Sequence, residues 1–130
     1  VTGVQTCALP ISGFEEPDVD RLMGDPSIVR NRRKIEATVA NARALVALQG
    51  EGESLDALVW GFRPPRRPRP ARASDIPSSS AESTALSREL KRRGFAFVGP
   101  TTMHAALQAC GVIDEHLQGC SVATGPSGVV

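Results

Sequence analysis

Residues 86–111, LSRELKRRGFAFVGPTTMHAALQACG, decide the fold of this chain. Leu86 and Leu90 lie one helical turn apart, which predicts a helix with one buried face. Gly94 is expected to end that helix, because glycine is the preferred residue just past a helix C-terminus. A second helix is expected after Gly99, so the segment between the two glycines forms a tight hairpin. Its apolar side chains are expected to be buried in the core and to anchor the hairpin there: Phe95, Phe97 and Val98.

The hairpin combines features that suit a phosphate group. Its glycines can take positive φ and let the backbone approach a ligand closely. The second helix then offers free N–H groups and the positive end of its dipole. We expect contacts to a nucleic-acid backbone, without base reading, at these residues: Gly94, Gly99, Thr101, Thr102, Arg92 and Arg93. An ordinary helical hairpin with glycine caps explains the same pattern, and geometry alone leaves both interpretations open.

Helix signals recur along the rest of the chain, whereas strand signals are nearly absent. In the first half of the chain, helices are expected within 15–23, after an N-cap and proline at Asp25-Pro26, and at about 31–49, where Gly50 ends the helix. Further helices are expected at 55–60, capped by Ser54, at about 80–93, capped by a capping box of Ser79 and Glu82, and at 101–110. Because aromatic residues make up only 4% of the chain, the core must be aliphatic. The sequence therefore predicts an all-α fold of five or six short helices, with Trp60 as a core residue.

Basic residues are clustered although the net charge is only +1. One cluster lies in 63–79, an arginine- and proline-rich segment whose prolines forbid a regular helix, so a long surface loop is expected there. The other clusters lie in 30–34 and 88–93. A polyanionic partner is one interpretation, and solvated helix faces are the other. No apolar run approaches the length of a membrane span, so no membrane partner is expected.

His116 and Cys120 are four residues apart, and one helical turn would place imidazole and thiolate on the same side. This spacing suits two ligands of a zinc ion, but a structural site needs four. A surface histidine beside a packed cysteine is the alternative. Beyond residue 11 the chain has only Cys110 and Cys120, too few for a disulfide framework, so a reducing compartment and a cytoplasmic location are expected.

The first eleven residues, VTGVQTCALPI, show neither helical nor strand periodicity. They can be back-translated into a string that looks like a sequencing-library adapter, and we expect 1–11 to be a translated artefact. In that interpretation the natural sequence begins near Ser12, inside a larger gene, and the domain occupies 12–120. A flexible tail is expected at 121–130, which is rich in glycine, serine and threonine.

Four separated motifs, in order, resemble the DNA-3-methyladenine glycosylase I family of the helix-hairpin-helix glycosylase superfamily. They are SIVRNRRKIEATVANARA (27–44), LDALVWGF (55–62), DIPSSSAESTALSRELKRRGFAFVGPTT (75–102) and LQACGVIDEHLQGC (107–120). The resemblance covers nearly everything from about Phe14 to Cys120. It implies a helix-hairpin-helix glycosylase domain that is truncated at its N-terminus.

The resemblance also implies a function. The family hydrolyses the N-glycosidic bond of 3-methyladenine in alkylated double-stranded DNA, as a base-excision repair enzyme, and a monomer is expected at full length. It assigns the hairpin residues to DNA phosphate, and His116 and Cys120 to half of a structural zinc site. The other two ligands and the catalytic glutamate belong to an N-terminal segment that this chain lacks, so no catalytic residue is expected here.

At two positions the family resemblance does not assign a role directly. His104 stands where the family commonly has an aromatic residue, and Asp114 falls near the catalytic aspartate of other hairpin glycosylases although this family's acid lies elsewhere. Three hypotheses follow: the C-terminal part of a 3-methyladenine glycosylase, a noncatalytic DNA-binding module built on the hairpin, or an all-α fragment that is inactive until its missing part is supplied.

Overall fold

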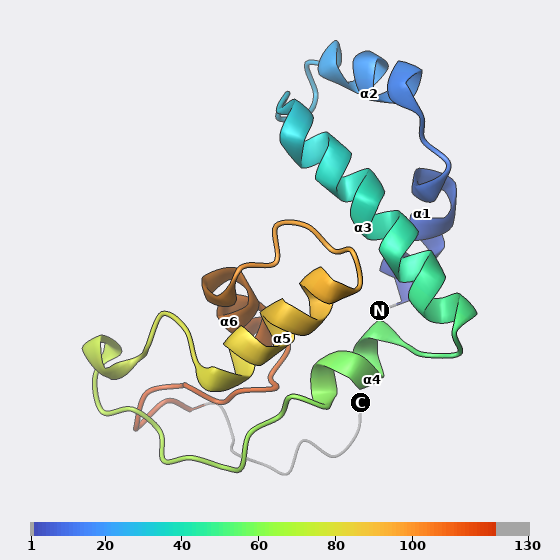
Figure 1. The fold of residues 1–130 in the computed structure, drawn as a ribbon. Coiled ribbons are helices and arrows are strands. Elements are labelled where there is room, and N and C mark those ends of the chain that lie inside the picture. Colours follow the sequence, from blue (N-terminus) through green and yellow to red (C-terminus); the bar gives the residue numbers. More distant parts are fainter. Residues whose placement is uncertain (1, 122–130) are drawn as a thin grey trace.

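The computed structural model describes residues 2–121, and side chains from Cys7 onward; within that range every regular element is a helix (Figure 1). The α-helices are α1 (Thr2–Ser12), α2 (Glu16–Met23), α3 (Arg32–Gly50), α4 (Leu55–Trp60), α5 (Ala81–Arg92) and α6 (Pro100–Ala109), with a 3-10 helix at Ala73–Asp75. The predicted all-α class is confirmed. The expected tail lies outside the described residues, except for Ser121.

The helices form two groups that meet along α3 (Figure 1). In one group, α1 packs along the C-terminal half of α3, and α2 covers the N-terminal half. In the other group, α5 and α6 pair with each other across the hairpin. The helix α4 leads from the first group into the long loop that passes beneath the α5–α6 pair.

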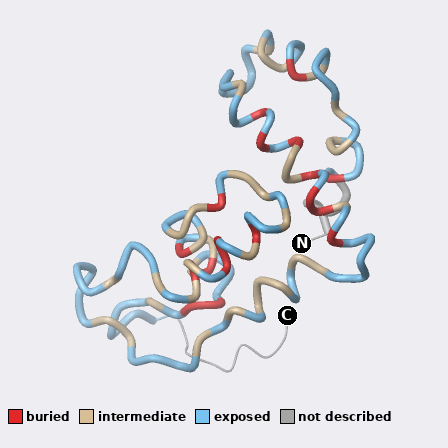
Figure 2. Tube along the Cα trace, in the orientation of Figure 1, coloured by how far each residue is buried: buried red, intermediate tan, exposed pale blue. Residues whose placement is uncertain are grey.

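The main hydrophobic core lies between α5, α6 and the segment that follows α6 (Figure 2). Leu86 is 1% exposed and Leu107 is 0% exposed, so each is enclosed on all sides. The remaining buried members are Leu90, Val98, Val112 and Ile113. Trp60 is half-buried against this core, as the aliphatic pattern predicted. These side chains fix the angle between the two helices and so position the hairpin that joins them.

The second core cluster joins α1 to α3 and combines two alanines with two leucines: Ala8, Ala42, Leu45 and Leu48. The expectation that residues 1–11 lack helical structure is wrong. Local sequence gave no helical period there, but burial of Ala8 against α3, with Ile11 packed beside it, stabilises the helix through tertiary contact. That residues 1–11 are a translated artefact stays a prediction.

Helix starts differ from the sequence in two places. The expected start at Asp25-Pro26 is wrong, because Asp25 Oδ1 accepts hydrogen bonds from the Ser27 N–H and hydroxyl and holds a turn there. The chain becomes helical only after Asn31, whose side chain accepts from the Lys34 N–H.

The capping box of α5 is shifted by one residue from the predicted pair Ser79 and Glu82. Its members are Ser80 and Ser83, each of whose side chains accepts from the other's backbone N–H. A run of three serines offers several registers, and packing decides among them, because Ser83 is 0% exposed and faces the core. The predicted cap of α4 by Ser54 is confirmed.

The arginine- and proline-rich loop is held against the α5–α6 pair by polar contacts. Arg67 pairs with Glu82 at the start of α5, and Arg69 pairs with Asp114 after α6. The backbone also joins the two segments, since the Gln118 N–H donates to the Pro70 carbonyl at 2.9 Å. Among the described residues, no helix combines the length and the apolar character that a membrane crossing requires.

Candidate functional site

The hairpin begins with a left-handed glycine. Gly94 has φ +88°, and the N–H groups of Gly94 and Phe95 donate to the carbonyls of Lys91 and Leu90. This is the Schellman arrangement that ends a helix with glycine. The expectation of positive φ is therefore confirmed at Gly94.

The same expectation is wrong at Gly99. Its φ is −64°, and it serves as the N-cap of α6. A side chain added at Gly99 would meet no atom within 4 Å, so this position faces open space. The left-handed residue near this end of the hairpin is Phe97, with φ +58°.

Asn41 on α3 holds the tip of the hairpin. Its side-chain Nδ2 donates to the Ala96 carbonyl at 3.1 Å, and its Oδ1 accepts from the Ala96 N–H at 2.7 Å. One amide thus satisfies both backbone groups of a residue that lies 55 positions away. The hairpin is therefore anchored to α3 through its backbone, a contact that sequence reasoning missed because a helical asparagine reads as a solvated residue.

The three apolar residues of the hairpin do not share one role. Val98 is 7% exposed and belongs to the main core, and Phe95 is half-buried between the two core clusters. Phe97, by contrast, is 60% exposed. The expectation that all three plug the hairpin into the core is wrong for Phe97, because its left-handed backbone turns the side chain to solvent.

Arg92 and Arg93, the arginines before the hairpin, are paired with carboxylates. Both contact Glu89, and Arg93 also contacts Glu53 at 2.9 Å. Hydrogen bonds from Arg92 and then Arg93 lower the pKa of Glu89 to about 2. Glu89 raises the pKa of Arg92, and Glu53, followed by Glu89, raises that of Arg93. Arg93 is enclosed, with 16% of its side chain exposed, whereas Arg92 keeps 67%. Arg92 is therefore the one of the two that can reach an external phosphate.

The start of α6 presents the expected hydrogen-bond donors. Thr101 and Thr102 are both exposed. Their N–H groups fall in the first turn, where helical geometry provides no carbonyl partner. Pro100 is the first residue of the helix and has no N–H to satisfy. Gly99 and the threonines thus present an open start of α6, whereas Gly94 lies against α3, where a side chain would meet Ala44. That these residues contact phosphate stays a prediction.

His116 and Cys120 come together, although not on a helix. The segment after α6 is irregular, and the predicted helical turn is wrong; the Cys120 Sγ nevertheless lies 3.8 Å from the His116 Nδ1. That separation and the imidazole–thiol chemistry fit two ligands of one tetrahedral zinc ion. Across the described residues, no three histidine, cysteine or acidic side chains gather into a metal-binding group. The pair therefore fits half of a zinc site.

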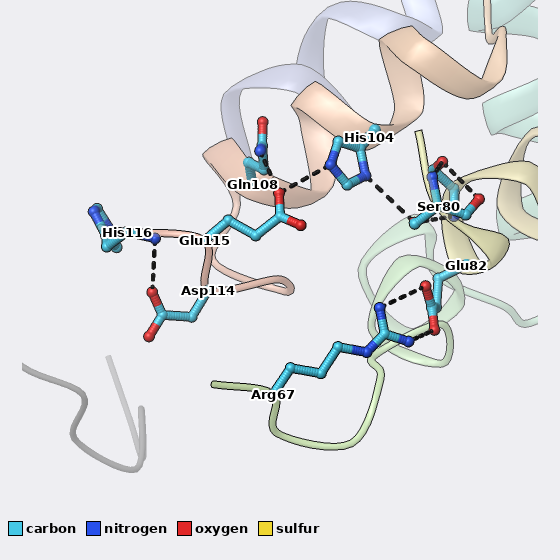
Figure 3. A network of polar contacts seen from close by, with 9 residues as sticks. Arg67, Ser80, Glu82, His104, Gln108, Asp114, Glu115 and His116 are labelled. Atoms are coloured by element: carbon cyan, nitrogen blue, oxygen red, sulfur yellow. Dashed lines mark hydrogen bonds and ion pairs between the residues drawn. The ribbon is translucent and has the colours of Figure 1, made fainter. Parts of the chain in front are cut away.

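A buried polar network connects α5, α6 and the segment after α6 (Figure 3). His104 is 2% exposed; its Nε2 lies 2.9 Å from Glu115 Oε2, and its Nδ1 lies 3.3 Å from the Ser80 hydroxyl. The Gln108 amide donates to the same carboxylate oxygen. Sequence reasoning missed this network, although His104 and Gln108 are one turn apart on the inward side of α6.

Asp114 is engaged in the structure of the loop. Its Oδ2 accepts from Arg69 Nε at 3.2 Å, and its Oδ1 accepts from the His116 N–H at 3.2 Å. Burial opposes ionisation of this carboxyl group, but the hydrogen bond from His116 and the ion pair with Arg69 outweigh burial and lower its pKa. The ionised Asp114 thus fixes the segment that carries His116 onto the long loop.

A cavity of about 440 Å³ lies between the long loop and the segment 111–115. Its wall mixes arginines and prolines with three acidic side chains: Asp75, Asp114 and Glu115. At its edge, the Arg63 guanidinium lies 5.5 Å from the centroid of the Trp60 ring. The mixed charge gives this cavity no preference for an anion or a cation.

Comparison with known proteins gives one family. The model described as methyladenine glycosylase matches residues 8–124. DNA-3-methyladenine glycosylase 1 of Escherichia coli is 41% identical over 112 residues, which cover 85% of this chain and 60% of the relative. The Haemophilus influenzae DNA-3-methyladenine glycosylase is 38% identical over 110 residues, covering 82% and 59%. The chain thus spans about three fifths of the length of these curated relatives.

Solved structures agree with the sequence comparison. A crystal structure of 3-methyladenine DNA glycosylase I superposes with a TM-score of 0.83 at 40% identity, covering 88% of this chain and 64% of that one. A Staphylococcus aureus 3-methyladenine DNA glycosylase I, in a variant with glutamine in place of a glutamate, gives a TM-score of 0.81 at 33% identity and covers 88% and 62%. A further similar structure, with a TM-score of 0.79 at 34% identity, is a complex with 3-methyladenine.

Proposed function

This chain belongs to the methyladenine glycosylase family, and from that premise we propose that it is part of an enzyme that releases 3-methyladenine from alkylated DNA. The match that runs from residue 8 to residue 124 carries the proposal. The reaction is hydrolysis of the N-glycosidic bond, the first step of base-excision repair. We further propose that the protein acts in the cytoplasm as a monomer on double-stranded DNA.

The chemistry divides into extruding the base and cutting the bond. An enzyme that acts on a base must take it out of the stack, and a damaged base costs less to extrude. The 3-methyl adduct carries positive charge, so it is already a good leaving group. The protein must therefore grip the strand, hold the extruded base and place a carboxylate near it.

Of these tasks, the present chain supplies the binding of the DNA backbone. The open edge of the hairpin offers exposed hydroxyls at Thr101 and Thr102, unpaired N–H groups in the first turn of α6 and an unobstructed backbone at Gly99. Arg92 adds a cation beside it. These groups suit phosphate oxygens, which position a protein on DNA without reading its sequence.

The carboxylates of the segment after α6 have other partners. Asp114 is bound to Arg69 and Glu115 is bound to His104 and Gln108, so both act as structural groups. We therefore propose that the catalytic glutamate lies in a part of the protein outside this sequence. Incubated with methylated duplex DNA, the 130-residue chain is expected to release no 3-methyladenine above the buffer rate, whereas a longer product of the same gene releases it. Release by the short chain would overturn this assignment.

DNA binding by the hairpin is tested at Gly99. Threonine there meets no neighbouring atom and suits an N-cap, but its side chain stands where a phosphate would approach. Gly99→Thr is expected to weaken binding of duplex DNA about five- to tenfold, the loss of one or two backbone hydrogen bonds. Gly50→Thr, also in open space but at the end of α3, is the matched control and is expected to bind as the parent does. Equal binding by both variants would contradict the hairpin assignment.

We also propose that His116 and Cys120 supply two of four ligands to a structural zinc ion. Such an ion would stabilise the irregular segment after α6, which makes few backbone hydrogen bonds of its own. Titration of the chain with Zn²⁺ is expected to show one weak site that is lost in Cys120→Ser. Cys110→Ser is the matched control, because Cys110 is also exposed but is not paired with a histidine. Zinc binding that survives in Cys120→Ser would contradict the proposal.

A noncatalytic DNA-binding module is the second candidate. The observation that favours it is the complete hairpin in a chain whose nearby carboxylates are engaged. Salt-sensitive binding of duplex DNA by the 130-residue chain is expected under both candidates, because phosphate contacts release counterions. A longer gene product that binds DNA but never releases 3-methyladenine would favour the module.

A further inference from the structure

Phe97 is a hairpin residue whose conformation and exposure are favoured neither by burial in the core nor by backbone preference. It has φ +58°, and it is the sole non-glycine residue with positive φ in the described part of the chain. A bulky side chain disfavours this conformation, because its Cβ crowds the following carbonyl. Phe97 is also 60% exposed, so its ring gains little from burial. Both local free-energy terms oppose the observed arrangement.

Asn41 forces this arrangement from outside the hairpin. Its amide pairs with both the N–H and the carbonyl of Ala96, at 2.7 and 3.1 Å. On the other side of Phe97, Val98 is buried in the main core at 7% exposure. With its two neighbours fixed, the residue between them completes the turn in the left-handed conformation, and its ring faces solvent. The protein thus uses a long-range contact to expose a large apolar group.

The charge of the chain segments that flank the ring suits a polyanion. From Leu90 to Ile113 the sequence holds no aspartate or glutamate. The exposed cations Arg88 and Lys91 lie on the helix that leads into the hairpin, and neither forms an ion pair with a described residue. An apolar tip on such a surface matches the minor groove of duplex DNA, whose phosphates are anionic and whose floor is formed by sugars and base edges. Proteins that bind this groove commonly insert a phenylalanine or another apolar wedge.

We infer that Phe97 is the apolar contact of the hairpin with the minor groove of duplex DNA, held in position by the clamp from Asn41. The inference rests on the proposed function and adds to it one apolar contact beside the proposed phosphate contacts of the hairpin. Phe97 meets the DNA, whereas Asn41 is a positioning residue that acts through it.

Two substitutions at position 97 separate the apolar contact from the backbone conformation. Asparagine tolerates the left-handed region but removes the apolar ring, whereas leucine keeps an apolar side chain. Phe97→Asn is expected to raise the Kd for duplex DNA about tenfold, as loss of one aromatic contact does, without lowering the thermal midpoint. Phe97→Leu is expected to stay within about threefold of the parent, because a leucine is also a competent wedge. Val29→Ser, which removes an exposed side chain far from the hairpin, is the control.

The outcomes are distinct. If the parent and Phe97→Asn bind DNA equally while Gly99→Thr binds weakly, the proposed function stands and the role of Phe97 is wrong. If the parent chain does not bind DNA, both fail. A double-mutant cycle then tests the clamp: Asn41→Ala is expected to weaken binding several-fold in the parent but not in Phe97→Asn. Equal losses in both backgrounds, with circular dichroism showing intact helices, would mean that Asn41 does not act through Phe97.

Discussion

The two core clusters of this protein are built from different side chains. The cluster between α5 and α6 interlocks large aliphatic residues such as Leu86 and Leu107, both at most 1% exposed. The cluster between α1 and α3 contains Ala8 and Ala42, whose small side chains let the two helices approach closely. The buried residues of the first region are all large aliphatic ones, whereas the second region combines leucines with alanines between its helices. Different substitutions therefore damage each region.

The largest effect is expected from a cavity in the α5–α6 core. Leu107→Ala removes a fully enclosed side chain, and we expect a loss of about 4 kcal/mol in the free energy of unfolding. Leu48→Ala, at 2% exposure in the α1–α3 cluster, is expected to cost about 2–3 kcal/mol, because the surrounding side chains are partly exposed and can move into the void. Urea denaturation followed by circular dichroism measures both. A larger loss for Leu48→Ala would reverse the contrast between the two regions.

The next effect concerns the polar network of the α5–α6 end. His104→Leu leaves the Glu115 carboxylate, whose side chain is only 16% exposed, without its imidazole partner. We expect a loss of about 2–3 kcal/mol in the free energy of unfolding, because a carboxylate close to the core keeps the Gln108 amide as its one remaining partner. The double substitution His104→Leu with Glu115→Leu removes both partners and is expected to recover part of that loss. No recovery would show that the histidine contributes through packing alone.

A substitution from small to large tests the α1–α3 region. Ala42→Leu inserts a larger side chain where α1 approaches α3, and we expect it to cost about 2 kcal/mol by overpacking. Ala47→Leu lies on the exposed side of the same helix and is expected to change the free energy by less than about 0.5 kcal/mol. Thermal denaturation of the two variants gives the comparison. Equal midpoints would indicate that α1 does not pack closely on α3.

The smallest effect is electrostatic and depends on pH. Arg92 and Arg93 depress the pKa of Glu89 from 4.5 to about 2 in the folded chain. A depressed carboxyl pKa contributes stability above the unfolded value, and that contribution is lost as the pH falls toward 2. The parent is therefore expected to be slightly more stable than Glu89→Gln at pH 6, with the difference vanishing near pH 2. Urea midpoints at pH 6, 4 and 2 measure this, and a difference that persists at pH 2 would contradict the assigned cause.

Local signals predicted the α5–α6 unit well. The spacing of Leu86 and Leu90 marked the buried face of α5, and Gly94 marked its end. Each of these features depends on residues within a few positions of one another. The start of α5 was displaced by one residue because consecutive serines offer equivalent caps, and only the burial of Ser83 selects the register.

The sequence by itself determined the helical class, the main aliphatic core and the family resemblance. Tertiary structure alone decided that α1 is a helix, that Asn41 clamps Ala96, that Phe97 faces solvent, and that His104 is buried against Glu115. The physical reason is range. Periodicity and caps are set by neighbours within one or two turns, whereas these four features arise from contacts between separate segments, whose energies appear only when the helices are packed.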